Sequence, residues 1–309
     1  MGLKDAIYLA AKSTRPIIIS PWLYSRRMRP NSTSIMDWMK VPITRVYDVE
    51  YLITCLAQKN ISALYPCHPD TCVSNFSPPR LKQTEIERGH NKTLPFVIAN
   101  FNPIPIFETP NEHHRREEID KCITWSCEAQ KIGNSILNGI RMKSGKETFE
   151  NVVGFHLRVE DDFNMHIANG RKKRNITSAK LLSFIPNEVV KCALDCYNAT
   201  GAHMNVSGIW VYMASGARKN SPELGEFRKF FPRILAKEDF LLRRPPLGDD
   251  YLATIDSVVL EELSFFVGCW SSTFSIQVAR NRRLKNSASA LYTMDIPCQC
   301  HKYYTPIVV

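Results

Sequence analysis

The sequence predicts an α/β protein with a doubly wound, mostly parallel sheet, and three observations support this fold class. Buried apolar runs alternate with helix-like segments through the second half of the chain, the order that produces parallel sheets. The chain has 309 residues, of which 44% are hydrophobic, so one large or two medium domains can bury a core. Uninterrupted apolar runs stay short of the roughly 18 residues that a membrane span needs.

The first twenty residues indicate the back half of a β-α-β unit. A short amphipathic helix is predicted from apolar residues at helical spacing, namely Leu3, Ala6, Ile7 and Ala10. Residues 16–20 follow as a buried strand. Because a parallel unit needs a strand before its helix, we expect the front strand of this domain to precede Met1.

The middle of the chain predicts a boundary between two domains. Apolar runs with Pro and Asn punctuation precede a polar stretch at 111–120. A helix is expected over about Ile119 to Leu137, interrupted or ended near Gly133. The polar segment 142–150 is the best linker candidate. We therefore expect an N-terminal domain over 1–149 and a C-terminal domain over 150–309.

The second half has the clearer pattern. Buried strands are predicted over residues 152–157, 208–213 and 265–268. Helices are predicted over residues 188–197, 222–231 and 273–284, and around Ile255, Val259 and Leu263. In such a fold, ligands bind at the carboxyl ends of the strands.

The charge balance favours anionic partners without identifying one. Forty Lys and Arg against thirty Asp and Glu give a formal net charge of +10. The basic run 171–174 is expected to be a solvated loop, and Arg280, Arg282 and Arg283 fit the last turns of a helix, where cations complement the dipole. The sequence contains no nucleic-acid-binding signature, so nucleic acid is the least favoured partner.

Cysteines and glycosylation acceptors indicate a secretory-pathway lumen, the endoplasmic reticulum or Golgi. Seven Asn-X-Ser/Thr acceptors occur, at Asn31, Asn60, Asn75, Asn91, Asn175, Asn198 and Asn205. The ten cysteines, several in close pairs, suit disulfides whose connectivity the sequence leaves open. Cys192 and Cys196 can also be read as buried thiols on one helix face. The spacings do not repeat those of zinc fingers, so no metal site is predicted. The start lacks a signal peptide, which conflicts with this compartment unless the front end is missing.

Two runs carry the candidate chemistry. The first, His156-Leu157-Arg158 followed by acidic residues, lies where a buried strand gives way to a loop. Its arginine presents donors that suit a diphosphate, although an ion pair with the acidic run is an equal alternative. In the second, Gly268 allows a tight strand-to-helix turn, and residues 271–273 can cap a helix and leave backbone amides for a phosphate.

Together these runs resemble the GDP-fucose protein O-fucosyltransferases. In that family His-X-Arg closes the first strand of the second domain, and an Asp on a helix precedes Phe-Val/Ile-Gly-X-X-X-Ser-Ser/Thr-Phe-Ser/Thr. The matching positions here are His156 and Arg158, Asp256, and Phe266-Val267-Gly268 leading to Ser272-Thr273-Phe274-Ser275. The resemblance covers nearly the whole chain, strongly after Val152 and loosely before it.

The resemblance implies a GT-B fold, in which two Rossmann-like domains face each other across a cleft and the second holds the nucleotide sugar. It implies that Arg158 binds the diphosphate and stabilises the leaving group and that His156 lines the donor pocket. Asp256 would contact the guanine, and Ser272, Thr273 and Phe274 would grip the phosphates and ribose. GDP-fucose is then the donor substrate, and no cofactor or metal ion is required.

The sequence departs from the family at its start. It lacks the family's opening Gly-Gly-X-X-Asn-Gln-Arg-like loop, so the first domain is expected to be truncated and the catalytic base stays unassigned. The leading hypothesis is metal-independent, inverting transfer of fucose to a protein Ser or Thr hydroxyl. The alternatives are a glycan acceptor and a noncatalytic relative that only binds nucleotide or protein.

Overall fold

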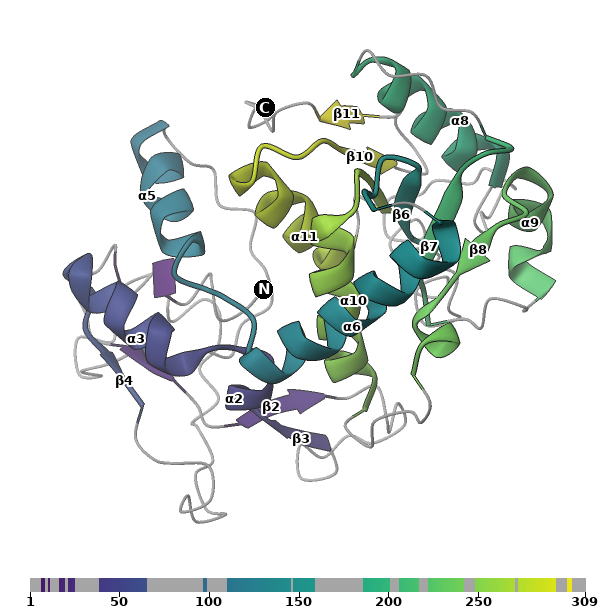
Figure 1. Ribbon diagram of the computed structural model, residues 1–309. Coiled ribbons are helices and arrows are strands. Elements are labelled where there is room, and N and C mark those ends of the chain that lie inside the picture. Colours follow the sequence, from purple (N-terminus) through teal and green to yellow (C-terminus); the bar gives the residue numbers. More distant parts are fainter. Residues whose placement is uncertain are drawn as a thin grey trace, which may run out of the picture. The chain divides into compact units, whose positions relative to one another are not determined.

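The computed structural model describes residues 7–8, 11, 17–19, 22–25, 39–65, 97–98, 110–145, 147–158, 186–200, 206–216, 222–241, 248–269, 272–292 and 299–301 (Figure 1). The chain divides into two compact units. The N-terminal unit comprises Met1–Lys131 and Leu247–Thr254, and the C-terminal unit comprises Ile132–Pro246 and Ile255–Ile307. The domain limits predicted from the sequence, 1–149 and 150–309, stay a prediction.

A parallel sheet of three short strands lies in the N-terminal unit. Its order is β4 (Ala63–Leu64), β1 (Ile17–Ile18), β5 (Val97–Ile98). The strand predicted over residues 16–20 is therefore confirmed as the central strand of a parallel sheet, with Ile17 between Ala63 and Val97. An antiparallel pair, β2 (Trp22–Ser25) and β3 (Met39–Pro42), forms a separate sheet.

The helix predicted over residues 119–137 is two helices. The first, α5 (Pro110–Asp120), occupies the segment expected to be a polar stretch, and the second is α6 (Cys127–Ser144). The chain breaks between them because Ser126 caps α6, donating its backbone N–H to Val46 and accepting the Ala129 N–H at 3.1 Å. Gly133 lies inside α6, where a Cβ would be 2.4 Å from Val258. Helix α6 also takes in the first residues of the predicted linker.

A six-stranded sheet forms the centre of the C-terminal unit, in the order β11-β10-β9-β6-β7-β8 (Figure 1). All neighbours pair in parallel except β10 and β11, which are antiparallel. The bounds are β6 Val152–His156, β7 Trp210–Ala214, β8 Ile234–Leu235, β9 Phe265–Cys269, β10 Ser289–Tyr292 and β11 Gln299–His301. Strands β6, β7 and β9 confirm the three strands predicted for this half.

Helices cover both faces of this sheet, as the doubly wound prediction requires. Alternate residues of a strand point to opposite faces. Phe155 and Val267 belong to the core cluster with residues of α8 and α9, whereas Gly154 lies against Leu260 of α10 and Gly268 against Ser275 of α11. The bounds are α8 Pro186–Asn198, η2 Pro222–Leu224, α9 Gly225–Phe230, η3 Lys237–Asp239, α10 Gly248–Glu262 and α11 Thr273–Leu284. Every residue of β6 and β9 is buried, which is typical of a parallel sheet covered on both sides.

Arg282 of α11 binds the end of the preceding helix rather than that of its own. Its side chain is fully buried, and burial lowers the pKa of its guanidinium to about 10. The guanidinium donates hydrogen bonds to the carbonyl oxygens of Leu260, Glu261, Leu263, Ser264 and Ala288. The first of these acceptors belong to the last turn of α10, whose carbonyls have no partner within the helix. Arg282 lies in the last turn of α11, as the sequence predicted, but the dipole account did not include these bonds to the end of α10.

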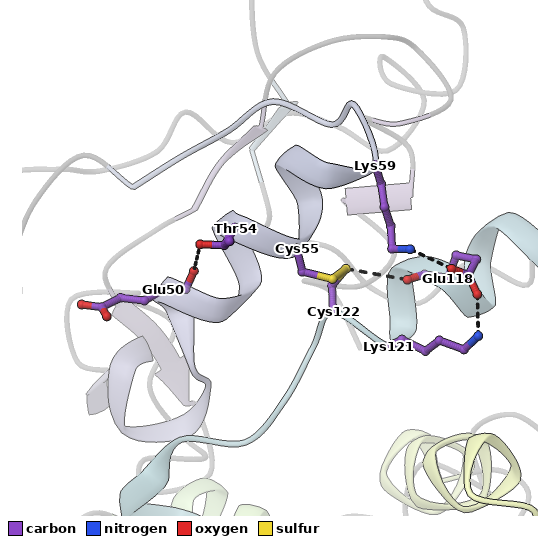
Figure 2. The surroundings of a disulfide bond; sticks show 7 residues. All are labelled: Glu50, Thr54, Cys55, Lys59, Glu118, Lys121 and Cys122. Carbon is purple, nitrogen blue, oxygen red and sulfur yellow. Dashed lines mark hydrogen bonds and ion pairs between the residues drawn. A yellow bond between two sulfur atoms is a disulfide. The ribbon is translucent and has the colours of Figure 1, made fainter.

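The N-terminal unit contains a disulfide between α3 (Val49–Gln58) and the second residue after the end of α5 (Figure 2). Cys55 and Cys122 are bonded across 67 residues of sequence. Next to them, Lys59 and Lys121 both pair with the carboxylate of Glu118, at 2.7 and 2.5 Å. Helix α2 (Ile43–Val46) precedes α3. The bridge and the Lys59–Glu118 pair connect α3 to α5, whereas the Lys121–Glu118 pair is local to the end of α5.

Helix α8 carries two further disulfide-bonded cysteines, Cys192 and Cys196. The alternative that they are buried thiols is thereby wrong, although both are buried in the core cluster. Cys127 and Cys269 are not disulfide-bonded. Among the described helices, none combines the length and apolar character that crossing a membrane requires.

The ion pairs of Glu118 predict a pH-dependent contribution to stability. Hydrogen bonds from Lys121 and then Lys59 lower the pKa of Glu118 to about 2, from an ordinary 4.5. Because the folded-state pKa is depressed, this contribution is present at neutral pH and is lost as pH falls through about 2. We expect Glu118→Gln to be less stable than the natural sequence at pH 7, by an amount that shrinks below pH 4.5.

Denaturant unfolding at several pH values measures this difference. Glu50→Gln is the control for removing one carboxylate, because the Glu50 side chain points away from both lysines (Figure 2). A stability difference for Glu118→Gln that is constant from pH 7 to pH 2.5 contradicts the prediction.

Candidate functional site

The carboxyl ends of β6 and β9 meet at one edge of the C-terminal sheet. The two strands are parallel neighbours, with Gly154 opposite Phe266 and Phe155 opposite Val267. Each strand therefore leaves the sheet at the same edge, β6 at His156 and β9 at Cys269. Helix α11 begins four residues after β9. The topology thus brings the two runs singled out in the sequence to one edge, which is where doubly wound sheets bind ligands.

His156 contacts the first turn of α11 directly. Its Nδ1 lies 2.6 Å from the Oγ of Ser275, and its ring centroid lies 4.5 Å from that of Phe274. The hydroxyl of Tyr292, at the end of β10, donates to the backbone carbonyl of His156 at 3.4 Å. With only 7% of its surface exposed, His156 at the end of β6 is held between the start of α11 and the end of β10.

Arg158 lies two residues beyond β6, on the same edge as His156. The chain is still attached to the sheet there, because the Leu157 N–H donates to the Ala214 carbonyl at the end of β7. The Arg158 side chain is partly buried and makes interactions of its own. For Thr273 the structure describes the backbone, which begins α11, while its side chain lies outside the described residues.

Ser272 is the N-cap of α11, but its side chain does not cap the helix. Only 1% of the residue is exposed, and its Oγ has no hydrogen-bond partner in the part of the chain that the structure describes. A buried hydroxyl without a partner costs roughly 1–3 kcal/mol, and the first amides of a helix also need acceptors. The amino end of a helix carries a partial positive charge. This arrangement is suited to an anionic group that accepts from both the hydroxyl and the amides.

Gly268 is required by packing rather than by a turn. It lies within β9, and its backbone is not in the left-handed region. A Cβ at this position would lie 2.7 Å from both Cβ and Oγ of Ser275 and 2.6 Å from the Phe266 ring. The expectation of a tight strand-to-helix turn at Gly268 is therefore corrected: glycine allows α11 to pack closely on β9, which keeps Ser275 within reach of His156.

Asp256, on α10, has partners inside the C-terminal unit. Its Oδ1 accepts from the Tyr212 hydroxyl at 2.7 Å, and its Oδ2 is paired with the Lys237 ammonium at 2.8 Å. Burial raises the pKa of Asp256, and the lysine and the tyrosine hydroxyl oppose this rise. Burial and the neighbouring carboxylate raise the pKa of Tyr212 well above 10. The guanine-binding role of Asp256 stays a prediction, and its contacts are those of a buried polar cluster.

Sequence reasoning missed the contacts of Ser275, Lys237 and Tyr212. Ser275 was part of the quoted motif, and its place in the first turn of the helix after β9 was a usable signal. Lys237 follows an edge strand in an ordinary Ala-Lys-Glu-Asp context, which gives no sign of burial. Only the folded structure places it over Asp256.

The comparisons with known proteins agree with this architecture. The sequence model of the GDP-fucose protein O-fucosyltransferase family, O-FucT, matches residues 53–285. A crystal structure of POFUT1 in complex with GDP has a TM-score of 0.54 and 13% identity, covering 96% of this chain and 94% of that chain. POFUT1 in complex with GDP-fucose has a TM-score of 0.52 and 12% identity, covering 91% and 89%. No curated protein sequence matches the chain.

These findings define the class of protein and then its family. The parallel sheets and the similarity to POFUT1 identify an α/β fold that is GT-B-like. The family match spans well over half of the chain. The protein belongs to the GDP-fucose protein O-fucosyltransferase family.

Proposed function

We propose that this protein transfers fucose from GDP-fucose to a Ser or Thr hydroxyl of a protein acceptor, with inversion at the sugar carbon and without a metal ion. The observation that carries the proposal is the buried Ser272 hydroxyl, which has no hydrogen-bond partner among the described residues. It lies at the amino end of α11, the helix whose first turn contacts His156. Family membership supports GDP-fucose as the donor. No cofactor takes part.

The electrostatic demand of the reaction fits these groups. When the bond between the sugar and the diphosphate breaks, negative charge develops on the β-phosphate oxygen. A fixed guanidinium and helix-end amides, held in place before the reaction, stabilise such charge with little reorganisation. In the proposal Arg158 supplies the guanidinium. Ser272 and the first amides of α11 bind phosphate oxygens, and His156 and Phe274 line the donor pocket.

The proposed step is a single displacement. The acceptor hydroxyl oxygen attacks the anomeric carbon from the face opposite to GDP and forms the new C–O bond. The bond to the β-phosphate oxygen breaks, and GDP leaves with the electron pair. The hydroxyl proton leaves to a base, for which the described residues offer no assignment. Inversion follows from attack on the face opposite to the leaving group.

An assay with the purified full chain tests the proposal. Labelled GDP-fucose is supplied with folded protein domains and, separately, with a glycan array, each with and without EDTA. We expect label on protein Ser or Thr, with equal yield in EDTA. Label only on glycans assigns the acceptor differently, and loss of transfer in EDTA contradicts metal independence. Calorimetric GDP binding without transfer or donor hydrolysis supports the noncatalytic alternative, and no GDP binding refutes the proposed donor site.

We further propose that the protein acts in the lumen of the secretory pathway. The Cys55–Cys122 disulfide and the bonded Cys192 and Cys196 suit an oxidising compartment. Two of the seven acceptor asparagines, Asn60 and Asn198, lie in the described residues, and both side chains are exposed just beyond or at the end of a helix. Asn31, Asn75, Asn91, Asn175 and Asn205 lie outside the described residues.

Exposure of these two residues predicts N-glycosylation at Asn60 and Asn198. A glycan on either side chain extends into solvent without displacing core residues. We expect the protein, secreted from eukaryotic cells behind an added signal peptide, to lose one glycan mass in Asn60→Gln and one in Asn198→Gln. Intact-mass measurement before and after removal of N-glycans reads this out. Unmodified Asn60 and Asn198 in a secreted, folded product contradict the prediction, and Asn138→Gln, outside any acceptor motif, is the control.

A further inference from the structure

Ser275 connects the ends of β6 and β9 through one buried hydroxyl. The residue is fully buried in the first turn of α11. Its Oγ accepts the backbone N–H of Cys269 at 3.0 Å and lies 2.6 Å from Nδ1 of His156. Ser275 packs closely on the backbone of Gly268: a Cβ at Gly268 would lie 2.7 Å from both the Cβ and the Oγ of Ser275. Ser275 was not among the site residues that the sequence predicted.

The hydrogen-bonding capacity of the hydroxyl decides the direction of its bond to the histidine. A serine hydroxyl has one proton and two acceptor sites. The Cys269 N–H can only donate, so it occupies one acceptor site of the Ser275 oxygen. The Ser275 hydroxyl proton then needs an acceptor of its own. Leaving that buried proton without an acceptor is unfavourable. Within the part of the chain that the structure describes, His156 Nδ1 is the acceptor within reach.

We propose that Ser275 is a positioning residue for His156: its hydroxyl donates to Nδ1 and thereby places the proton of the neutral imidazole on Nε2. A neutral imidazole carries one N–H, so an Nδ1 that accepts requires an Nε2 that donates. The Phe274 ring packs against the imidazole, with the ring centroids 4.5 Å apart. The proposal rests on the proposed function, because Nε2–H is the donor that this residue offers to a phosphate oxygen or sugar hydroxyl of the nucleotide sugar.

Nitrogen NMR of the full-length protein with ¹⁵N-labelled histidine tests the tautomer directly. The resonances of His156 are assigned by their loss in His156→Gln. In the natural sequence above pH 8 we expect Nε2 to be protonated and Nδ1 not. We expect Ser275→Ala to show both tautomers in exchange. An Nδ1–H tautomer in the natural sequence overturns the proposal, as does a Ser275→Ala spectrum identical to it.

Donor binding and turnover supply the functional readout. We expect Ser275→Ala to weaken GDP binding and to lower kcat/KM for fucosyl transfer about 10-fold, the lower end of the effect of losing a hydrogen-bond partner that orients a functional histidine. Ser275→Thr keeps the hydroxyl and should retain the Nε2–H tautomer. Ser264→Ala is the matched control, since that hydroxyl donates to the Val152 carbonyl at the opposite ends of the same two strands.

The two arms separate failure of this inference from failure of the proposed function. If the natural sequence binds no GDP, the donor site is refuted while the NMR measurement still decides what Ser275 does. If GDP binds but Ser275→Ala and Ser264→Ala have equal binding and turnover, the positioning role is refuted and the donor site stands. If Ser275→Ala does not fold, the tautomer in the natural sequence and in Ser275→Thr decides the question.

Discussion

Replacing Arg158 with alanine is expected to lower the turnover of fucosyl transfer by about 10²- to 10³-fold, the usual effect of removing one preorganised donor from a developing anion. The departing diphosphate carries more negative charge in the transition state than in bound GDP-fucose, so the loss should fall mainly on kcat. Arg158 also lies beyond the last residue of β6 and is only partly buried, so the substitution should leave the core intact. Steady-state kinetics with GDP-fucose and thermal unfolding measure the two effects.

Two further variants sharpen this test. Arg158→Lys keeps the charge but loses the planar pair of donors, and we expect it to recover only part of the activity. Arg233→Ala removes an exposed arginine of the same unit that lies over the Trp210 ring, and it should keep full turnover. Natural turnover in Arg158→Ala would refute the leaving-group role, and equal losses in Arg158→Ala and Arg233→Ala would indicate a general charge effect.

Lys237→Met is expected to destabilise the protein by about 3–5 kcal/mol, the usual cost of leaving one member of a buried ion pair without its partner. Only 8% of the Lys237 side chain and 6% of that of Asp256 are exposed, so water cannot replace the lost contact. Burial raises the pKa of Asp256 even with the lysine present, so the pair does not fully offset the cost of desolvating the carboxylate. Denaturant unfolding of the folded variants gives the free-energy difference.

The double variant Lys237→Met with Asp256→Leu tests what Asp256 does. If Asp256 serves the core alone, removing both charges should recover most of the lost stability, because apolar groups often replace a buried pair without loss. If Asp256 also binds the donor, the double variant should be stable yet bind GDP weakly. Lys285→Met is the control, since its pairs with Glu261 and Glu262 leave 45% of its side chain exposed, and we expect a change below about 1 kcal/mol. A similar loss in the control would contradict the ion-pair account.

The sequence was sufficient to predict strands and helices where a buried strand of a parallel sheet produces a local run of apolar residues. The predicted strand 152–157 is β6, and the predicted helix 273–284 has the bounds of α11. Both faces of such strands are covered, so most of their residues are apolar or small and the run is easy to recognise. The edge strand β11 and the two-residue β8 lack this signature, because their sequence is short and mixed. They were not predicted.

Contacts between residues far apart in the sequence could not be predicted in the same way. The burial of Arg282 depends on carbonyls at the end of α10, which its guanidinium reaches only when α10 and α11 pack against the same sheet. The break between α5 and α6 depends on pairing of the chain near Ser126 with Val46. In both cases the deciding hydrogen bonds join residues that are far apart in the sequence, so a local sequence pattern does not predict them.

Part of the candidate site could be predicted from the sequence. His156 and Phe274 were named from the resemblance, and the structure places their rings together. The motif alone could not say that Ser275 would face the histidine, since that follows from the register of β6 against β9 and from close packing on Gly268. For Asp256 the motif position predicted a contact with the ligand, whereas the contacts that the structure describes are with Tyr212 and Lys237.

The strand order of the C-terminal sheet has a consequence for biosynthesis. One side of β6 pairs with β7, which follows soon, but its other side pairs with β9, which begins more than a hundred residues later. At the ordinary rate of translation, β6 has an open apolar edge for about 5 to 20 s before its second neighbour leaves the ribosome. Nascent chains that stall before Phe265 should therefore be held by chaperones or aggregate, and those that stall well beyond Tyr292 should not.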